Sequence, residues 1–259
     1  IIMFGRSTAN RDRKEQSVMV KEAISISLCI VAIGLTGCGT TAKFVYPADG
    51  RDLIEFSNGP AYDRKVAVTP FEEMRGDTNQ SGTYFLYLIP LMPFGYAEYE
   101  RPDAARMFNT IAEFDFDASE DLAKAAAYSL RKSGLFRDAF FTFGGDKDQA
   151  QLLFEGEILS TTYKGTLWTY GLSGYGPLLW CFGLPAGTSA NDLILALKVT
   201  DLATQKVLWD KKYDLDRKIV QGLYYKFGHD VRGYPYLMQD IMNDAIEDMN
   251  REFQKQGLK

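Results

Sequence analysis

The sequence predicts an α/β fold, a mixed β-sheet with two principal helices packed on it, and three observations support this prediction. Residues 118–133 and residues 236–254 carry apolar side chains at the spacing of one helix face. Between them, residues 193–199 have the period of a strand, and a turn at residues 201–205 leads into a second strand at residues 206–215. Strands and helices that follow one another in a chain with 46% hydrophobic and 24% charged residues are typical of one globular α/β domain.

The first element in chain order is a strand at residues 64–71, a β-branched run that Pro70 stops. The helix over residues 118–133 is expected because Asp117 and Glu120 stand three residues apart, as in a capping box. Basic residues and Gly134 close it. Its predicted apolar face consists of Leu122, Ala126 and Leu130.

Two further strands are predicted at residues 138–143 and 152–163, before the hairpin. If the second hairpin strand is regular, Val207 and Trp209 share one face and Leu208 lies on the other. Methionine dominates one side of the last helix, which favours core packing over a binding groove because methionine fills irregular gaps. That side consists of Met238, Met242, Ala245, Met249 and Phe253.

The amino-terminal region carries an export signal. Residues 23–35 form 13 uncharged positions, too few to span a bilayer as a helix but typical of a signal peptide. The run ends in Leu35-Thr36-Gly37-Cys38, which resembles the lipobox of bacterial lipoproteins. The resemblance implies cleavage between Gly37 and Cys38, and acyl chains on Cys38 that anchor the protein firmly. Gly39, in place of the aspartate that retains such proteins in the inner membrane, implies the outer membrane, facing the periplasm.

The expected organisation is a signal peptide at residues 1–37, a lipidated tether at residues 38–63 and a periplasmic α/β domain at residues 64–259. Met19 would begin a compact signal peptide, which leaves residues 1–18 upstream of it. The signal removes five of 29 basic and three of 34 acidic residues, so the mature chain has a formal net charge of −7. Such an acidic chain disfavours nucleic acid as a partner.

Two uncharged inserts interrupt the predicted scaffold, at residues 78–97 and residues 165–191. Their prolines and glycines argue against membrane-spanning helices, yet their many aromatic residues need to be buried. Three interpretations are open: an extra core layer over the sheet, a surface for a partner or for self-association, and contact with a membrane. The candidate partner surface consists of Trp168, Tyr170, Tyr175 and Trp180.

Several segments resemble a known family by residue class: RKVAVTPFEEMRGD, the helix ending SLRKSGLF, AQLLFEGEI and LILALKVTDLATQKVLWDKKY. They look like the periplasmic lipoproteins with a TolB-amino-terminal-like fold, a group that includes the curli secretion channel lipoprotein. The matching pieces cover about half of the mature chain, and the resemblance brings no catalytic residues with it.

The residues needed for catalysis are scarce. His229 is the only histidine, so a catalytic triad has one candidate base and a histidine-rich metal site cannot form. Asp115 and Asp117 are the only carboxylate pair to nominate, and helix capping explains the acidic cluster around them. Cys29 lies in the predicted signal peptide, and Cys38 would carry lipid. Cys181 would then be the one free cysteine of the mature chain, so no disulfide can form within it.

The expected function is therefore that of a non-catalytic outer-membrane lipoprotein, an assembly or interaction component of envelope machinery with no cofactor or metal. It would contact outer-membrane lipid through the acyl chains on Cys38, and an envelope protein or a second copy of itself through its inserts. Two alternatives remain: a subunit of an oligomeric export pore, and a carbohydrate-binding or hydrolytic periplasmic protein.

Overall fold

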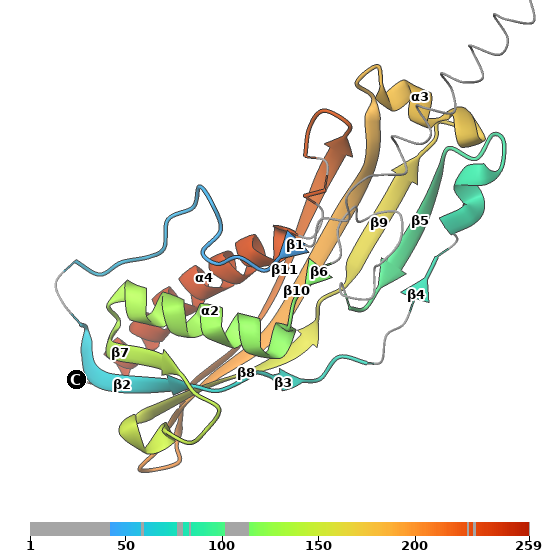
Figure 1. Cartoon of the computed structure of the whole chain (residues 1–259). Helices are drawn as coiled ribbons and strands as arrows, with labels where there is room; N and C mark the ends of the chain where they lie inside the picture. The colour runs from blue at the N-terminus through green and yellow to red at the C-terminus, as the bar shows by residue number, and fades with distance from the viewer. Residues whose placement is uncertain are drawn as a thin grey trace, which may run out of the picture. The chain divides into compact units, whose positions relative to one another are not determined.

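A computed structural model gives the arrangement of most of the chain (Figure 1). It describes residues 42–57, 60–76, 80–82, 84–101, 114–226, 228–229 and 232–258. The predicted signal peptide, the lipobox and Cys38 lie outside the described residues. Among the described residues, no helix combines the length and apolar character that crossing a membrane requires.

The described residues form a mixed α/β structure, as predicted. The strands are β1 (Ala42–Lys43), β2 (Tyr62–Val68), β3 (Glu72–Glu73), β4 (Gln80–Ser81), β5 (Phe94–Tyr99), β6 (Phe114–Asp115), β7 (Phe136–Phe141), β8 (Leu152–Ser160), β9 (Tyr163–Trp168), β10 (Pro185–Asp201) and β11 (Val207–Gly222). The α-helices are α2 (Ala118–Ser133), α3 (Pro177–Trp180) and α4 (Gly233–Lys255), and the 3-10 helices are η1 (Tyr84–Leu88), η3 (Lys147–Gln149) and η4 (Ser173–Tyr175). The described part thus contains three α-helices, of which α3 is a single turn, where the sequence predicts two principal ones.

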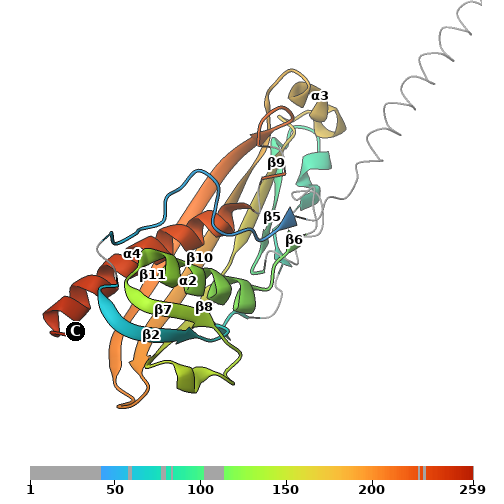
Figure 2. The same cartoon turned by 60° about the vertical axis from the view of Figure 1, so that its left-hand side comes forward.

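One curled sheet organises the described residues. Its strands follow the order β4-β5-β9-β10-β8-β2-β7, with β11 paired to β10 and β3 to β8. The pairs β2-β7 and β2-β8 are parallel, whereas β5, β9, β10 and β11 pair antiparallel. Figure 2 shows α2 and α4 side by side on one face of this sheet.

Helix α2 has the bounds that the sequence predicts. The Asp117 carboxylate accepts a hydrogen bond from the backbone N–H of Glu120 at 3.1 Å, which caps the first turn. Gly134 ends the helix with a φ of 68°, a left-handed conformation that glycine adopts without strain. Both signals are local in sequence, which is why the helix could be predicted.

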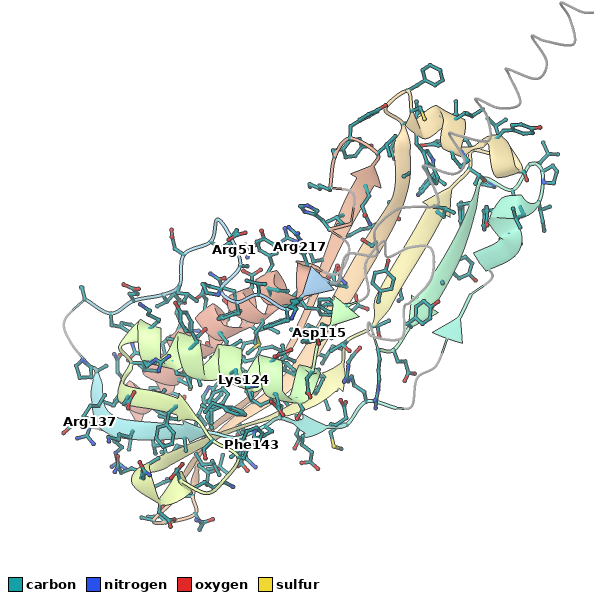
Figure 3. All side chains as sticks on the ribbon, in the orientation of Figure 1. Arg51, Asp115, Lys124, Arg137, Phe143 and Arg217 are labelled. Atoms are coloured by element: carbon teal, nitrogen blue, oxygen red, sulfur yellow. The ribbon has the colours of Figure 1, made fainter. Side chains whose placement is uncertain are left out.

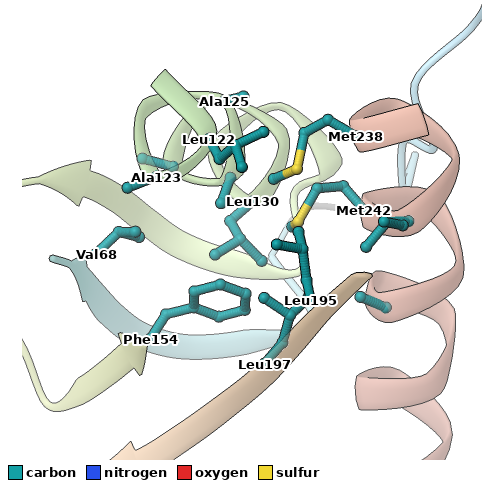
Figure 4. Packing of buried hydrophobic residues seen from close by; sticks show 14 of the residues in the cluster. Val68, Leu122, Ala123, Ala125, Leu130, Phe154, Leu195, Leu197, Met238 and Met242 are labelled. Carbon is teal, nitrogen blue, oxygen red and sulfur yellow. The ribbon is translucent and has the colours of Figure 1, made fainter. Parts of the chain in front are cut away.

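The core lies between the two long helices and the sheet. Figure 4 shows Leu122 and Leu130 of α2 pointing toward Met238 and Met242 of α4. All four side chains are fully buried, and Phe154 of β8 closes the cluster from the sheet. The methionine side of α4 is therefore core packing, as predicted.

The strand predicted at residues 152–163 is wrong in its continuity, because the chain bends after β8. Ser160 lies opposite Ile194 of β10, and Tyr163 lies opposite Asn191 of the same strand. Strands β8 and β9 therefore follow one another along β10, with a bend at Thr161. The hydroxyl of Tyr234 in α4 donates to the carbonyl oxygen of Thr161 at 2.9 Å, which holds the bend against the helix.

The predicted hairpin is present but longer and less regular than expected. Strand β10 begins at Pro185, inside the segment interpreted as an insert. Trp209 lies opposite Val199, and the register shifts beside this pair. Because of that bulge, Leu208 and Trp209 are both buried while Val207 is 44% exposed, so the predicted alternation is wrong here.

Residues 48–54, which lie within the segment predicted as a lipidated tether, run along α4 (Figure 1). The amide side chain of Gln239 accepts from the backbone N–H of Ala48 at 3.0 Å and donates to the carbonyl oxygen of Arg51 at 3.1 Å. Asn243, one helical turn on, accepts from the N–H of Ile54. These bonds satisfy backbone groups of residues 48–54, which belong to no strand.

Candidate functional site

Three uncharged segments of the chain meet at one end of the sheet and form what we call the uncharged tip, residues 86–97, 165–191 and 219–225. Pairing between β5 and β9, β9 and β10, and β10 and β11 brings them together. Sequence reasoning missed the third segment. The available signal was a run of seven uncharged residues that ends in two tyrosines.

Most of the exposed large hydrophobic side chains of the described residues belong to the uncharged tip. The most exposed are Leu91, at 88%, and Phe182, at 82%. Thirteen of seventeen lie there: Leu88, Ile89, Leu91, Phe94, Tyr96, Leu172, Tyr175, Leu178, Phe182, Val220, Leu223, Tyr224 and Tyr225. Such a concentration is typical of surfaces that bind another component, since apolar residues scattered singly would spread over the whole molecule.

The four residues of the predicted partner surface all lie in the uncharged tip, but only three of them meet. The Trp180 Nε1–H donates to the carbonyl oxygen of Trp168 at 2.9 Å, and the rings of Trp168 and Tyr170 lie 6.2 Å apart. These three side chains are half-buried, whereas Tyr175 in η4 is 74% exposed and stands apart. Residues 165–191 are thus neither a layer over the core nor a loose loop: they extend the sheet and cap its end.

Two tyrosine hydroxyls of the uncharged tip bond to backbone carbonyl oxygens of the tip itself. The Tyr170 hydroxyl donates to Pro185 at 2.7 Å, and the Tyr224 hydroxyl donates to Cys181 at 2.9 Å. Burial raises the pKa of the Tyr170 hydroxyl. The buried Nε1–H of Trp168 and the buried side-chain N–H groups of Asn191 are exceptions, since neither has a partner among the described residues.

Close backbone contacts fix the shape of the tip. A Cβ added at Gly187 would lie 2.0 Å from the carbonyl oxygen of Thr166 on β9. A Cβ added at Gly176 would lie 2.5 Å from the Cα of Thr169. Glycine is therefore required at both positions for β9, β10 and α3 to approach this closely.

The nominated carboxylate pair has structural partners in the described residues. Asp117 caps α2, and Asp115 lies 3.5 Å from the ammonium of Lys43. His229 is exposed overall. Partial removal of its ring from water and the nearby positive charge of Arg232 lower the pKa of His229. Within the described residues no group of three or more histidine, cysteine, aspartate or glutamate side chains could hold a metal ion.

A charged cluster joins α4 to β11 at the other end of the sheet. Asp248 accepts hydrogen bonds from the Tyr213 hydroxyl, at 2.8 Å, and from Lys211 and Arg251. Burial acts to raise the pKa of Asp248, but these donors outweigh it and hold the pKa below its usual range. The cluster borders a groove of about 480 Å³ and closes one end of the core.

Comparison with known proteins yields no family. No family model matches the chain, and no curated protein matches it. Among solved structures, a DUF330-family protein from Xanthomonas campestris is similar, with a TM-score of 0.46 and 9% identity, covering 85% of this chain and 100% of that one. A homologue of a neuraminyllactose-binding hemagglutinin from Helicobacter pylori is similar, with a TM-score of 0.32 and 10% identity, covering 81% of this chain and 92% of that one.

Proposed function

We propose that this chain is a non-catalytic lipoprotein of the bacterial outer membrane, an assembly or interaction component of the envelope that works through its uncharged tip. The observation that carries the proposal is the concentration of exposed apolar side chains at the meeting point of three uncharged segments. A surface of this kind lowers its free energy when another component covers it.

The position of the lipobox supports the same proposal. Cys38 precedes Ala42, the first residue of β1, by only four residues. A chain of that length spans at most about 14 Å. Acyl chains on Cys38 would therefore hold the folded chain close to the membrane surface, facing the periplasm.

Photocrosslinking in cells tests the proposal. A photoreactive phenylalanine analogue is placed at Phe182 in the tip, or at Phe143 as the matched control. Both positions are exposed, at 82% and 72%, and Figure 3 shows Phe143 near the end of β7, away from α3. We expect Phe182 to crosslink to envelope components and Phe143 to give little product. Equal crosslinking from the two positions would contradict a specific role for the tip.

A further inference from the structure

We infer that the uncharged tip inserts into the acyl-chain layer of a lipid bilayer. The inference rests on the proposed function in one respect, because it takes the tip to be the contact surface. It goes further in naming the occupant as lipid, and three features of the tip carry it: where charge stops, where polar groups point, and how the backbone is satisfied.

Within the four antiparallel strands, charged side chains stop at a single row, and beyond β11 the next charge is that of Lys226. Glu98 of β5 lies opposite Lys164 of β9, and the two form an ion pair of 3.2 Å. Lys164 lies opposite Ala190 of β10, which in turn lies opposite Lys218 of β11. From this row toward the loops, none of the four strands carries a charge. Contact with a protein partner does not require the last charged residues of several strands to lie at one level. The boundary between head groups and acyl chains does require it, because that boundary is a plane.

The row itself suits the head-group region. Lys164 and Lys218 are both exposed and lie on the same face of the sheet. Long lysine side chains can reach head-group phosphates while the strands continue into apolar surroundings. From Glu98 to Phe94 the strand rises about 13 Å, close to the roughly 15 Å of one leaflet. The strands of the tip are therefore long enough to pass through most of the acyl layer of one leaflet.

The outer surface of the tip is largely apolar, and several of its polar side-chain atoms bond to backbone carbonyl oxygens of the tip itself. Besides Tyr170 and Tyr224, the Thr169 hydroxyl donates to the carbonyl oxygen of Met92 at 3.2 Å, and the Ser173 hydroxyl donates to that of Leu88. Donors that are already bonded within the tip need no acceptor from a partner, which suits a hydrocarbon environment.

Much of the loop backbone of the tip is bonded within the tip itself, which favours entry into lipid. The N–H groups of Thr169 and Tyr170 both donate to the carbonyl oxygen of Pro93, and that of Leu91 donates to Gly171. Further on, the donating N–H groups are those of Leu172, Tyr175, Gly176, Leu179, Phe182, Gly183 and Leu184. Proline, which has no N–H to satisfy, occupies positions 90, 93, 177 and 185.

The three native tryptophans test this inference. Trp168 and Trp180 lie in the tip and Trp209 lies in the core. The full-length protein is reconstituted into phosphatidylethanolamine and phosphatidylglycerol vesicles whose acyl chains carry bromine, which quenches tryptophan on contact. In the Trp209→Phe variant, the remaining tryptophan fluorescence comes from Trp168 and Trp180 in the tip. In the double variant Trp168→Phe, Trp180→Phe, it comes from Trp209 in the core. If Trp209→Phe fails to fold, the difference between wild type and the double variant gives the tip signal.

We expect brominated lipid to remove about half or more of the tip fluorescence, since Trp168 lies four residues, about 13 Å, beyond the charged row at Lys164, within the roughly 15 Å of one leaflet. The Trp209 signal should not change. Leu91→Asp and Phe182→Asp, at exposed positions, should abolish tip quenching by lowering insertion at least about tenfold.

Tip fluorescence that brominated lipid leaves unchanged, in protein still held by the vesicles, would overturn the inference. If Phe182 then crosslinks to protein, a protein partner or a second copy covers the tip and the proposed function stands. If Phe182 crosslinks to nothing, both fail.

Discussion

Truncating Trp209 tests the packing of the long hairpin against α4. Trp209 is 6% exposed, lies opposite Val199, and its ring centroid lies 6.4 Å from that of Tyr213. A tryptophan side chain buries about 150–250 Å². At about 25 cal/mol per Å², its burial stabilises the fold by about 4–6 kcal/mol. Compact unfolded chains already bury part of this area, so about 3–5 kcal/mol is expected for Trp209→Ala.

Thermal unfolding followed by circular dichroism measures the effect. For a chain of this size, each kcal/mol lowers Tm by about 2–4 °C, so Trp209→Ala should lower Tm by about 6–20 °C. Val207→Ala is the control on the same strand, because Val207 is 44% exposed, and it should cost within about 0.5 kcal/mol. An unchanged Tm for Trp209→Ala would refute the packing argument and the register of β11.

Three further predictions follow from single residues. Cys38→Ser should abolish incorporation of a fatty-acid probe and leave unprocessed precursor, because serine is a far weaker nucleophile than a thiolate; labelled Cys38→Ser protein would refute the lipobox. Because the folded-state pKa of Asp248 is lowered, its stabilisation is present above the unfolded value of about 3.9 and disappears as pH falls through the folded value. Asp248→Asn should therefore lower Tm at pH 7 and flatten the acid limb of Tm against pH, whereas parallel curves would show that the cluster adds nothing. Gly187→Ala should cost about 1–3 kcal/mol in denaturant unfolding, while Gly174→Ala, whose Cβ meets nothing within 4 Å, should cost much less; equal costs would contradict the close strand approach.

Local signals made the helices predictable. The cap at Asp117, the stop at Gly134 and the apolar spacing of both helices depend on residues within a few positions of one another. The order of strand, helix, strands, hairpin and helix was enough to predict a mixed α/β fold, which the described residues have.

Features that depend on distant residues could not be predicted. The bend between β8 and β9 is held by Tyr234, 73 positions away from Thr161. The segment that looked like a tether is held by Gln239, 191 positions away from Ala48. Neither contact leaves a periodic pattern at the earlier position, so the sequence alone predicted an uninterrupted strand at residues 152–163 and gave no sign of the contacts between residues 48–54 and α4.

The candidate site was predicted in part for the same reason. The uncharged inserts and their aromatic residues are visible in the sequence, but their meeting depends on the register of four strands. The register also places residues 219–225 in the tip. Their uncharged run is too short to indicate a site from the sequence alone. Alignment of the last charged row is likewise a property of the pairing and not of any one segment.

Protection of a native thiol tests the central claim that the uncharged tip contacts the envelope. Cys181 is exposed in the tip, and a lipidated mature chain would have no other free thiol. Its alkylation by a membrane-impermeant maleimide is compared between isolated envelopes and detergent-purified protein, with Phe143→Cys in a Cys181→Ser background as the control. Because alkylation requires access to the thiol, Cys181 should react at least about tenfold more slowly in envelopes, and the control thiol should react equally in both. Equal rates for Cys181 in envelopes and in detergent would contradict the account.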